Sequence, residues 1–267
     1  MTLHPTALTI AGSDSGGGAG IQADLKTFSA LGVYGTSAIT AITAQNTRGV
    51  FGIEAVTVQT VSAQIAAVLD DIVPRAIKIG MLASAEIVDA VASAIADYAG
   101  PVVLDPVMVA KSGDVLLAKE AERALIQTLL PRAHVLTPNL PEAARLLDCD
   151  QARTADEMVA QGRALLDLGA GAVVMKGGHA EGPTCTDRLV TASGVVELEQ
   201  TRIDTHNTHG TGCSLSSAIA AELAKGADLE TAVRNAQHWL HGAIRWADNL
   251  GIGGGHGPVH HFHAVWT

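Results

Sequence analysis

The sequence predicts an α/β protein built on a mainly parallel β-sheet. Short β-like runs alternate with amphipathic stretches over most of the 267 residues, which is the pattern of successive strand–helix–strand units. The chain is 48% hydrophobic but only 3% aromatic, so Ala, Val, Leu and Ile must form its core. Because no internal repeat, low-complexity segment or linker interrupts the pattern, we expect residues 1–267 to form one domain.

The predicted strands are short apolar or β-branched runs bounded by Gly, Pro, Asn or Asp. Residues 101–107 form a wholly apolar run until an acid and a proline end it, and the last two strands resemble an antiparallel hairpin around Ser193-Gly194. In chain order, the predicted strands are residues 7–12, 36–45, 49–56, 76–80, 101–107, 133–139, 171–178, 185–192 and 195–203.

The predicted helices are the stretches between these strands in which apolar residues recur at helical spacing. The first of them ends on Gly32, a residue type that commonly terminates helices. In chain order, the predicted helices are residues 19–32, 57–72, 84–99, 118–130, 140–147, 155–169, 211–225 and 228–247.

Composition excludes several classes of function. A formal net charge of −10 argues against a nucleic-acid-binding protein, which normally carries a basic surface. Three widely spaced cysteines do not form a disulfide framework and suit a reducing compartment. Neither an export signal nor an apolar stretch of about 18 residues is found. We therefore expect a soluble, cytoplasmic protein that acts on a small molecule and contacts no membrane.

Polar or glycine-rich loops follow six of the predicted strands, and a seventh precedes a predicted helix. In mainly parallel sheets, ligands bind at the carboxyl ends of the strands, so these loops are expected to meet at one site. They are "GSDSGGGAG" (12–20), "AQN" (44–46), "GML" (80–82), "DPVMVAKSG" (105–113), "TPNLPE" (137–142), "KGGH" (176–179) and "NTHGTGC" (207–213).

The first glycine loop admits two interpretations besides a substrate site. Gly18 to Ala23 fits the G-x-G-x-x-A pattern of nicotinamide dinucleotide proteins, but no acid lies between Asp24 and Glu54 to bind the ribose. A tight structural turn is the other alternative. Ser13 and Asp14 add donors and acceptors that a simple turn does not need.

The turn formed by Gly210, Thr211 and Gly212 is expected to bind an anion. Glycines let successive N–H groups converge, and the start of a helix favours negative charge. Cys213, in the first helical turn, is expected to have a lowered thiol pKa in the same field. A helix cap with a small buried residue stays open, as does a zinc site made with His206 and His209.

Asn139 and Glu142 lie one helical turn apart at a strand–helix junction, where together with Asp105 they offer oxygen ligands for Mg²⁺, in part through water. A capping box is the alternative for the same pair. Lys176, which ends a buried strand, is placed to meet nucleotide phosphates, as is Lys111. The amide of Gln45 is suited to read the edge of a heteroaromatic ring.

Taken together, the seven loops resemble the hydroxymethylpyrimidine/phosphomethylpyrimidine kinases of thiamine synthesis, of the ribokinase superfamily, from about residue 7 to 263. The resemblance implies phosphorylation of 4-amino-5-hydroxymethyl-2-methylpyrimidine and of its monophosphate, using ATP and Mg²⁺. It also implies a ribokinase-like fold, in which helices flank a central, mostly parallel sheet with a small β flap, and commonly a homodimer.

The resemblance assigns roles to particular residues. Gln45 would bind the pyrimidine edge, with Gly12, Ala19, Asp24, Met81 and Val107 around the ring. The catalytic group would comprise Cys213, Lys176 and the anion hole of Gly210, Thr211 and Gly212. The nucleotide phosphates and the metal would be held by Lys176, Lys111, Asp105, Asn139 and Glu142.

Cys213 is the point at which this chain departs from the wider superfamily. Most ribokinase-like sugar kinases have an aspartate base after the glycine turn, whereas the pyrimidine kinases have cysteine. Whether the thiol takes the substrate proton or only lines the pocket is therefore open. Because a thiol can add to an aldehyde, pyridoxal kinase activity is the alternative function.

Overall fold

The computed structural model describes residues 4–108, 118–179 and 182–266. Its strands form one nine-stranded sheet in the order β3-β2-β1-β4-β5-β6-β7-β8-β9. The six neighbouring strands β2, β1, β4, β5, β6 and β7 pair in parallel. The antiparallel pairs β2–β3, β7–β8 and β8–β9 lie toward the two edges of the sheet. The strands are β1 Thr6–Asp14, β2 Tyr34–Asn46, β3 Gly49–Ala55, β4 Ala76–Ile79, β5 Val102–Leu104, β6 Val135–Leu136, β7 Val173–Met175, β8 Thr184–Thr191 and β9 Gly194–Thr201.

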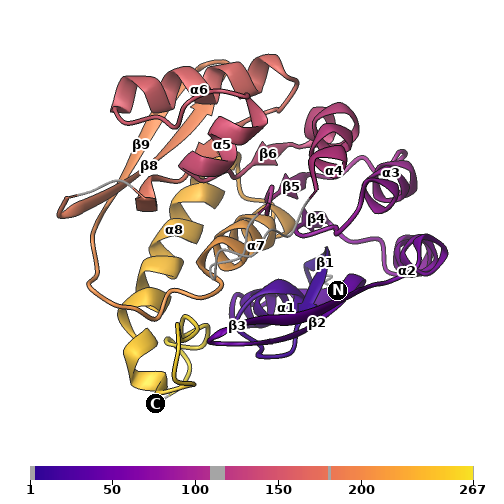
Figure 1. Cartoon of the computed structure of the whole chain (residues 1–267), viewed down its shortest axis with the longest axis horizontal. Helices are drawn as coiled ribbons and strands as arrows, with labels where there is room; N and C mark the ends of the chain where they lie inside the picture. Colours follow the sequence, from indigo (N-terminus) through magenta and orange to yellow (C-terminus); the bar gives the residue numbers. More distant parts are fainter. Residues whose placement is uncertain (1–3, 109–117, 180–181, 267) are drawn as a thin grey trace.

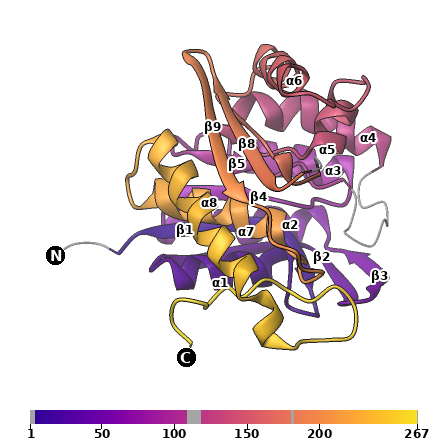
Figure 2. The ribbon, with the colours of Figure 1, turned by 90° about the vertical axis from the view of Figure 1, so that its left-hand side faces the viewer.

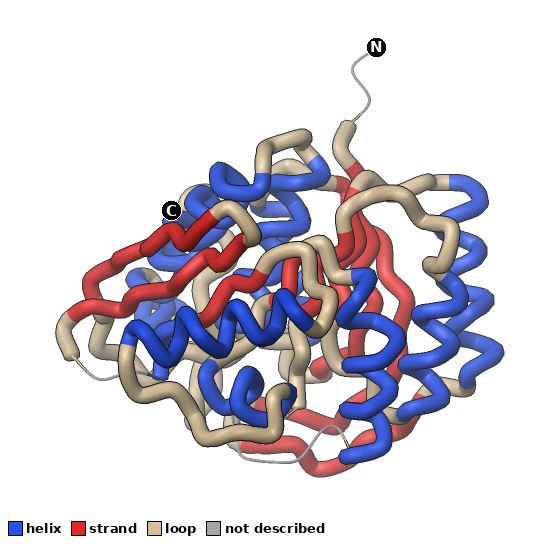
Figure 3. The backbone as a smooth tube through the Cα atoms, turned by 90° about the horizontal axis from the view of Figure 1, so that it is seen from above, coloured by secondary structure: helices blue, strands red, loops and turns tan. Residues whose placement is uncertain are grey.

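Helices cover both faces of this sheet (Figures 1 and 3). Helices α1, α7 and α8 pack on one face, with α8 running across the same side as α7 (Figure 2), while α2 to α6 pack on the other. The helices are α1 Gly20–Ala30, α2 Val58–Asp71, α3 Ala85–Ala94, α4 Lys119–Ala124, α5 Leu140–Leu146, α6 Ala155–Asp167, α7 Thr211–Ala224 and α8 Leu229–Arg245.

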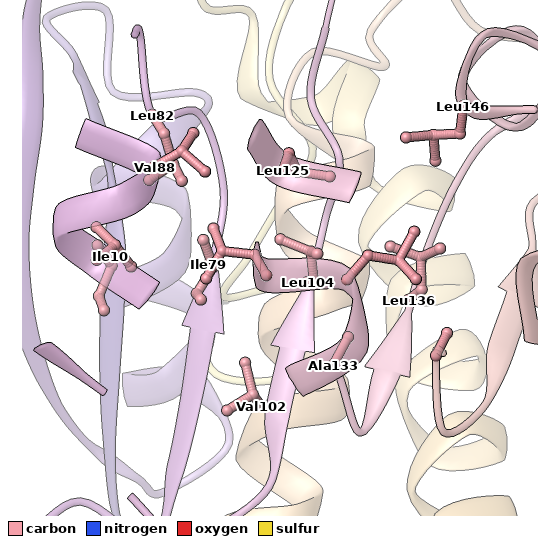
Figure 4. Close-up of a cluster of buried hydrophobic side chains, with 14 of the residues drawn as sticks. Ile10, Ile79, Leu82, Val88, Val102, Leu104, Leu125, Ala133, Leu136 and Leu146 are labelled. Atoms are coloured by element: carbon pink, nitrogen blue, oxygen red, sulfur yellow. The ribbon is translucent and has the colours of Figure 1, made fainter. Parts of the chain in front are cut away.

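Alternate residues of the central strands enter the two cores. Val102 and Leu104 of β5 pack with α2 to α6, in the cluster drawn in Figure 4, while Val103 packs with α1, α7 and α8. Successive side chains of a strand point to opposite faces of the sheet, so a strand covered on both sides must be apolar throughout. This confirms the expected mainly parallel α/β sheet flanked by helices.

Several elements differ in extent from their prediction. The central strands β5, β6 and β7 are shorter than expected, because the chain leaves the sheet as soon as the polar loop residues begin. The helix predicted over 118–130 continues after α4 as a π-helical turn, Leu125–Leu129, and a 3-10 turn, Leu130–Arg132. The expected β flap corresponds to the β2–β3 hairpin, which continues the main sheet and is exposed along most of β3.

A buried ion pair joins α1 to the centre of the sheet. The Lys78 ammonium of β4 lies 2.8 and 3.0 Å from the two carboxylate oxygens of Asp24 in α1, and both side chains are fully buried. The hydroxyls of Thr9 in β1 and Ser217 in α7 also donate to Asp24, at 2.6 and 2.7 Å. Burial alone would lower the pKa of Lys78, but the acidic groups around it, Asp24 foremost, together outweigh burial and raise the pKa, so Lys78 is a cation.

We predict that Lys78→Met strongly destabilises the protein, because it leaves the Asp24 carboxylate buried without its counter-charge. Removing one partner of a buried pair costs about 3–5 kcal/mol. Urea unfolding of Lys78→Met, Asp24→Asn and the double variant measures this cost. The neutral double variant is expected to be more stable than Lys78→Met; equal or lower stability would contradict the role given to the pair.

Candidate active site

A cavity of about 710 Å³ opens at the carboxyl edge of the parallel strands. The loops that the sequence singled out line it together, as expected for this class of sheet. Two predicted residues are exceptions: Asp24 is not in the cavity wall, and Lys111 lies outside the described residues. The predicted residues that do line the cavity are Gly12, Ala19, Gln45, Met81, Asp105, Val107, Asn139, Glu142, Lys176, Gly210, Thr211, Gly212 and Cys213.

The placement of Asp24 corrects the expectation that it surrounds the substrate. Its side chain is fully buried beneath the cavity, where its oxygens are taken by Lys78, Thr9 and Ser217. Lys78, its partner, reaches the cavity wall instead. A lysine within an otherwise apolar strand was the sequence signal for this residue, because an unpaired charge cannot be buried there.

One end of the cavity is formed by β1, β2 and the loop after β4. The Gly12 N–H donates to the Met81 carbonyl at 3.1 Å, and a Cβ at Gly12 would lie 2.6 Å from the Met81 Cε. Glycine therefore lets Met81 lie across this end. The Thr43 hydroxyl lies 2.8 Å from the Ser13 carbonyl oxygen and 3.2 Å from the Gln45 Oε1, so it shares its proton between them and holds the Gln45 amide beside β1. Thr43 was not predicted from the sequence, because a threonine in a β-strand is unremarkable.

The loop between β1 and α1 is organised around one carboxylate. Asp14 accepts hydrogen bonds from the N–H groups of Gly16 at 2.8 Å, Gly18 at 3.0 Å and Ala19 at 2.8 Å. A dinucleotide-binding loop would present such N–H groups to a pyrophosphate. Since Asp14 already occupies them, the structure does not support the nicotinamide alternative.

The glycine turn faces this loop at very short range. Gly210 has a φ of 80°, and a Cβ there would lie 1.8 Å from the Gly18 carbonyl oxygen, so only glycine fits. Thr211, Gly212 and Cys213 then form the first turn of α7 at the cavity wall. The first N–H groups of a helix have no partner within it and favour an anion.

Cys213 does not have the lowered pKa that we expected from its place at a helix start. Burial raises the pKa of its thiol to about 11, although the Lys78 ammonium acts in the opposite direction. The helix position alone predicts a more acidic thiol, but enclosure by the surrounding residues outweighs it. Cys213 is therefore a neutral thiol at physiological pH.

Lys176 links the glycine turn to two carboxylates. Its ammonium lies 3.0 Å from the Asp105 Oδ1 and 3.7 Å from the Glu142 Oε2. A Cβ at Gly212 would lie 3.3 Å from the Lys176 Nζ and 3.5 Å from the Asp105 Oδ2. The cation and one carboxylate thus lie directly beside the turn, where they can meet a transferred phosphate.

Asn139 and Glu142 form the capping box that was the alternative to a metal site. The Asn139 Oδ1 accepts from the Glu142 N–H at 2.8 Å, and the Glu142 Oε2 accepts from the Asn139 N–H at 2.7 Å. Burial raises the pKa of Glu142 and the Lys176 ammonium lowers it. The effect of burial is the larger, so the pKa is about 7. This carboxylate is held in place but incompletely neutralised by the protein.

The zinc alternative is not supported. Within the described ranges, no three His, Cys, Asp or Glu side chains gather in a way that could hold a metal. The Nε2 of His209 instead donates to the Asp14 carboxylate at 2.8 Å. This contact between the turn before α7 and the loop after β1 was not expected from the sequence.

The opposite end of the cavity was not predicted. It is bounded by β8, β9 and α8, and its walls are largely apolar or neutral apart from Asp187 and Arg202. The residues there are Cys185, Asp187, Gln200, Thr201, Arg202, Ile203, Gln237, Leu240, His241 and Ile244. No motif marks them, because they come from three separate elements and share no residue pattern in the sequence.

The fold and the cavity define a phosphoryl-transfer enzyme of the α/β class. A glycine turn at a helix start, an ammonium group and buried carboxylates converge at one strand edge, which is the arrangement that transfer of a charged group requires.

Comparison with known proteins places the chain within that class. It belongs to the phosphomethylpyrimidine kinase family, whose sequence model matches residues 14–260. The hydroxymethylpyrimidine/phosphomethylpyrimidine kinase of Rhizobium meliloti (strain 1021) is 56% identical over 260 residues, 97% of this chain and 98% of the relative. The resemblance noted in the sequence is thereby confirmed.

Solved structures agree with this placement. The phosphomethylpyrimidine kinase of Clostridium difficile 630 is 45% identical and superimposes with a TM-score of 0.80, over 90% of this chain and 99% of that one. The pyridoxal kinase of Staphylococcus aureus in complex with AMP-PCP and pyridoxal is 32% identical, with a TM-score of 0.89 over 98% and 95%. The ribokinase-like fold expected from the sequence is confirmed.

We predict that Glu142→Gln becomes more stable relative to the unchanged protein as the pH rises from about 4.5 to 7. In this window the unfolded Glu142 releases its proton while the folded one keeps it, so folding weakens as the pH rises. A pKa of about 7 against an ordinary 4.5 corresponds to a few kcal/mol at most. Urea unfolding of both proteins at pH 5, 6, 7 and 8 measures the difference in their free energies of unfolding.

Glu157→Gln is the matched control, since Glu157 occupies the same capping-box position in α6 but is exposed. Hydrogen bonds from the N–H groups of Arg153 and Thr154 lower the pKa of Glu157, so its small effect should have the opposite sign. Parallel pH profiles for the two variants would contradict the prediction.

Proposed function

We propose that this protein is an ATP-dependent kinase that phosphorylates 4-amino-5-hydroxymethyl-2-methylpyrimidine and then its monophosphate, in thiamine biosynthesis. The observation that carries the proposal is one cavity in which an oriented amide, an anion-binding turn with a cysteine, and a lysine between two carboxylates face the same space. The names of the relatives, at up to 56% identity over nearly the whole chain, support the same reaction.

In this proposal the pyrimidine ring binds at the Gln45 end of the cavity. The Thr43 hydroxyl engages the Gln45 carbonyl oxygen, which leaves the amide N–H groups to donate to a ring nitrogen. Met81 and Val107 offer apolar contacts to the two faces of the ring, while Gly12 and Ala19 let it approach the backbone. The hydroxymethyl group would then point toward Cys213.

The phosphates of ATP would lie between the glycine turn and Lys176. The S. aureus pyridoxal kinase was solved with the ATP analogue AMP-PCP, which supports ATP as the phosphate donor here. The N–H groups of the first turn of α7 would stabilise charge on the transferred group, and the Lys176 ammonium would hold the nucleotide phosphates. The adenine would occupy the end between β9 and α8, where Ile203, Leu240 and Ile244 offer apolar contacts.

The carboxylates fit Mg²⁺, which is commonly held by one or two carboxylates together with substrate phosphates and water. Asp105 and Glu142 share one ammonium, and Glu142 has a pKa of about 7, so an added cation would complete their neutralisation. Asn139 uses its side-chain oxygen for the cap, and we assign it the role of orienting Glu142. Bound Mg²⁺ would neutralise phosphate charge during transfer.

We assign Cys213 the role of accepting the proton of the substrate hydroxyl, late in the transfer. With a pKa of about 11, only about one thiol in 10⁴ is ionised at pH 7, so it is not a strong resting base. Transfer of a phosphoryl group is largely dissociative and needs little base strength. The Lys78 ammonium stabilises the thiolate once it forms.

We further propose that the enzyme is a cytoplasmic homodimer. All three cysteines are free thiols, which suits a reducing compartment. Ile42, Phe51 and Ile53 of the β2–β3 hairpin are 56%, 71% and 43% exposed, and exposed apolar side chains on an edge hairpin favour pairing with a second copy. In the part of the chain that the structure describes, no helix has the length and apolar character to cross a bilayer.

The paired substrate assay tests the proposed function. With ATP and Mg²⁺, ADP release is expected with the pyrimidine alcohol and with its monophosphate, and kcat/KM for each should exceed that for pyridoxal. Turnover of pyridoxal with the higher kcat/KM would establish the alternative function. Absence of turnover with the pyrimidine alcohol and its monophosphate would refute the proposal.

We predict that Cys213→Ala lowers kcat by about 10²-fold or more while KM for the pyrimidine changes little, because proton transfer contributes about 10²–10⁴-fold in enzymes. Steady-state kinetics at pH 7.5 measure both constants. Cys149→Ala, at an exposed cysteine outside the cavity, is the control and should stay within about two-fold. An unchanged kcat in Cys213→Ala would leave the thiol only a packing role.

A further inference from the structure

His209 lies between three segments that are far apart in the sequence. Its side chain is 11% exposed, and its Nε2 donates to the Asp14 Oδ2 at 2.8 Å. Its main chain bonds to the C-terminal segment, with its N–H donating to Gly257 at 3.0 Å and its carbonyl accepting from Val259 at 3.3 Å. The side chain is thus the polar link from the turn before α7 to the loop after β1.

Asp14 also binds the backbone of the loop after β1 through hydrogen bonds. The same oxygen that binds His209 also accepts the N–H groups of Gly18 and Ala19, and the other oxygen accepts that of Gly16. Burial alone would raise the pKa of Asp14, but His209 and the N–H groups of Ala19 and Gly16 lower it overall. An ionised carboxylate therefore joins the imidazole to three backbone groups, each at normal hydrogen-bond length.

The two segments joined in this way carry the two reactants of the proposed reaction. The loop of residues 12–19 borders the ring site, and the turn of residues 210–213 borders the phosphate site. They approach until a Cβ on Gly210 would meet the Gly18 carbonyl oxygen at 1.8 Å, and a Cβ on Gly18 would meet the His209 ring at 2.4 Å. Any shift of one segment therefore moves the ring site relative to the phosphate site.

We propose that His209 is a positioning residue for phosphoryl transfer, whose hydrogen bond to Asp14 sets the separation between the ring-site loop and the phosphate-binding turn. This inference rests on the proposed function. Transfer requires the attacking oxygen and the phosphorus to lie about 3–3.5 Å apart, and a misplacement of about 1 Å can reduce the rate about 10²-fold. His209 acts through Asp14 on the loop, and not on the reacting atoms.

Three variants test this role against a purely structural one. His209→Ala removes the donor and is expected to lower kcat by about 10- to 100-fold, with KM for ATP within about three-fold. His209→Gln places an amide N–H near the position of Nε2 and should recover at least half of the loss on a logarithmic scale. His134→Ala, at an exposed histidine outside the cavity, is the control and should stay within about two-fold.

A double-mutant cycle with Asp14→Asn measures the coupling directly. If the contact is the source of the effect, the variant Asp14→Asn/His209→Ala is no slower than the slower single variant. If the losses in kcat of the two single variants multiply in the double variant, the proposal is overturned. An unchanged kcat in His209→Ala would also overturn it, as would a folded His209→Gln as slow as His209→Ala.

Amide hydrogen exchange separates this proposal from the proposed function, because it needs no substrate. In His209→Ala, peptides covering residues 13–20 are expected to exchange at least ten-fold faster than in the unchanged protein, while peptides of β4 and β5 keep their protection. Unchanged exchange in residues 13–20 would overturn the inference. If the unaltered enzyme turns over neither pyrimidine, the proposed function is refuted. The exchange result would still show whether the His209–Asp14 hydrogen bond holds the loop of residues 13–20.

Discussion

The buried pair of Asp24 and Lys78 is the contact on which the site depends. Through it and the two hydroxyls that also bind Asp24, α1, β1, β4 and α7 are joined at one point. Helix α7 begins with the glycine turn of residues 210–212, so this point fixes where that turn stands relative to the sheet. A charged pair in a core contributes little net stability, but it tolerates only one arrangement of the elements that carry it.

The same ion pair extends into the chemistry of the cavity. Lys78 is held as a cation by Asp24 and in turn lowers the cost of ionising Cys213, whose thiol is otherwise disfavoured by burial. At the other side of the turn, Lys176 is shared by two carboxylates, and Glu142 is left with a pKa of about 7. The protein thus keeps one carboxylate poorly neutralised at the place where a bound cation would be useful, at some expense in stability.

The sequence was sufficient to predict the mainly parallel sheet, the loops that form the cavity and the residues of the glycine turn. These depend on local pattern: continuous apolar runs in strands such as β5, and glycines before α7 where the backbone has to bend. It also contained the capping box of Asn139 and Glu142, because that motif lies within four residues.

Properties that depend on depth or on distant partners were not predictable in the same way. Asp24 was assigned to the substrate because nothing local says that Lys78, 54 residues away, would bury it. The pKa of Cys213 was predicted in the wrong direction, since a helix start is visible in the sequence and enclosure by other segments is not. The contact of Asp14 with His209, 195 residues apart, had no local signal at all.

The close approach of Gly18 to Gly210 also determines when the cavity can exist during the life of the chain. Contacts between residues so far apart form late, because a long loop must be closed before they are gained. A ribosome-bound chain holding β1, α1 and even the whole central sheet would still lack the wall that faces the loop after β1. Catalytic competence would therefore arise only after α7 and the segment around Gly257 have been synthesised and docked, so enzyme activity reports completion of the entire fold.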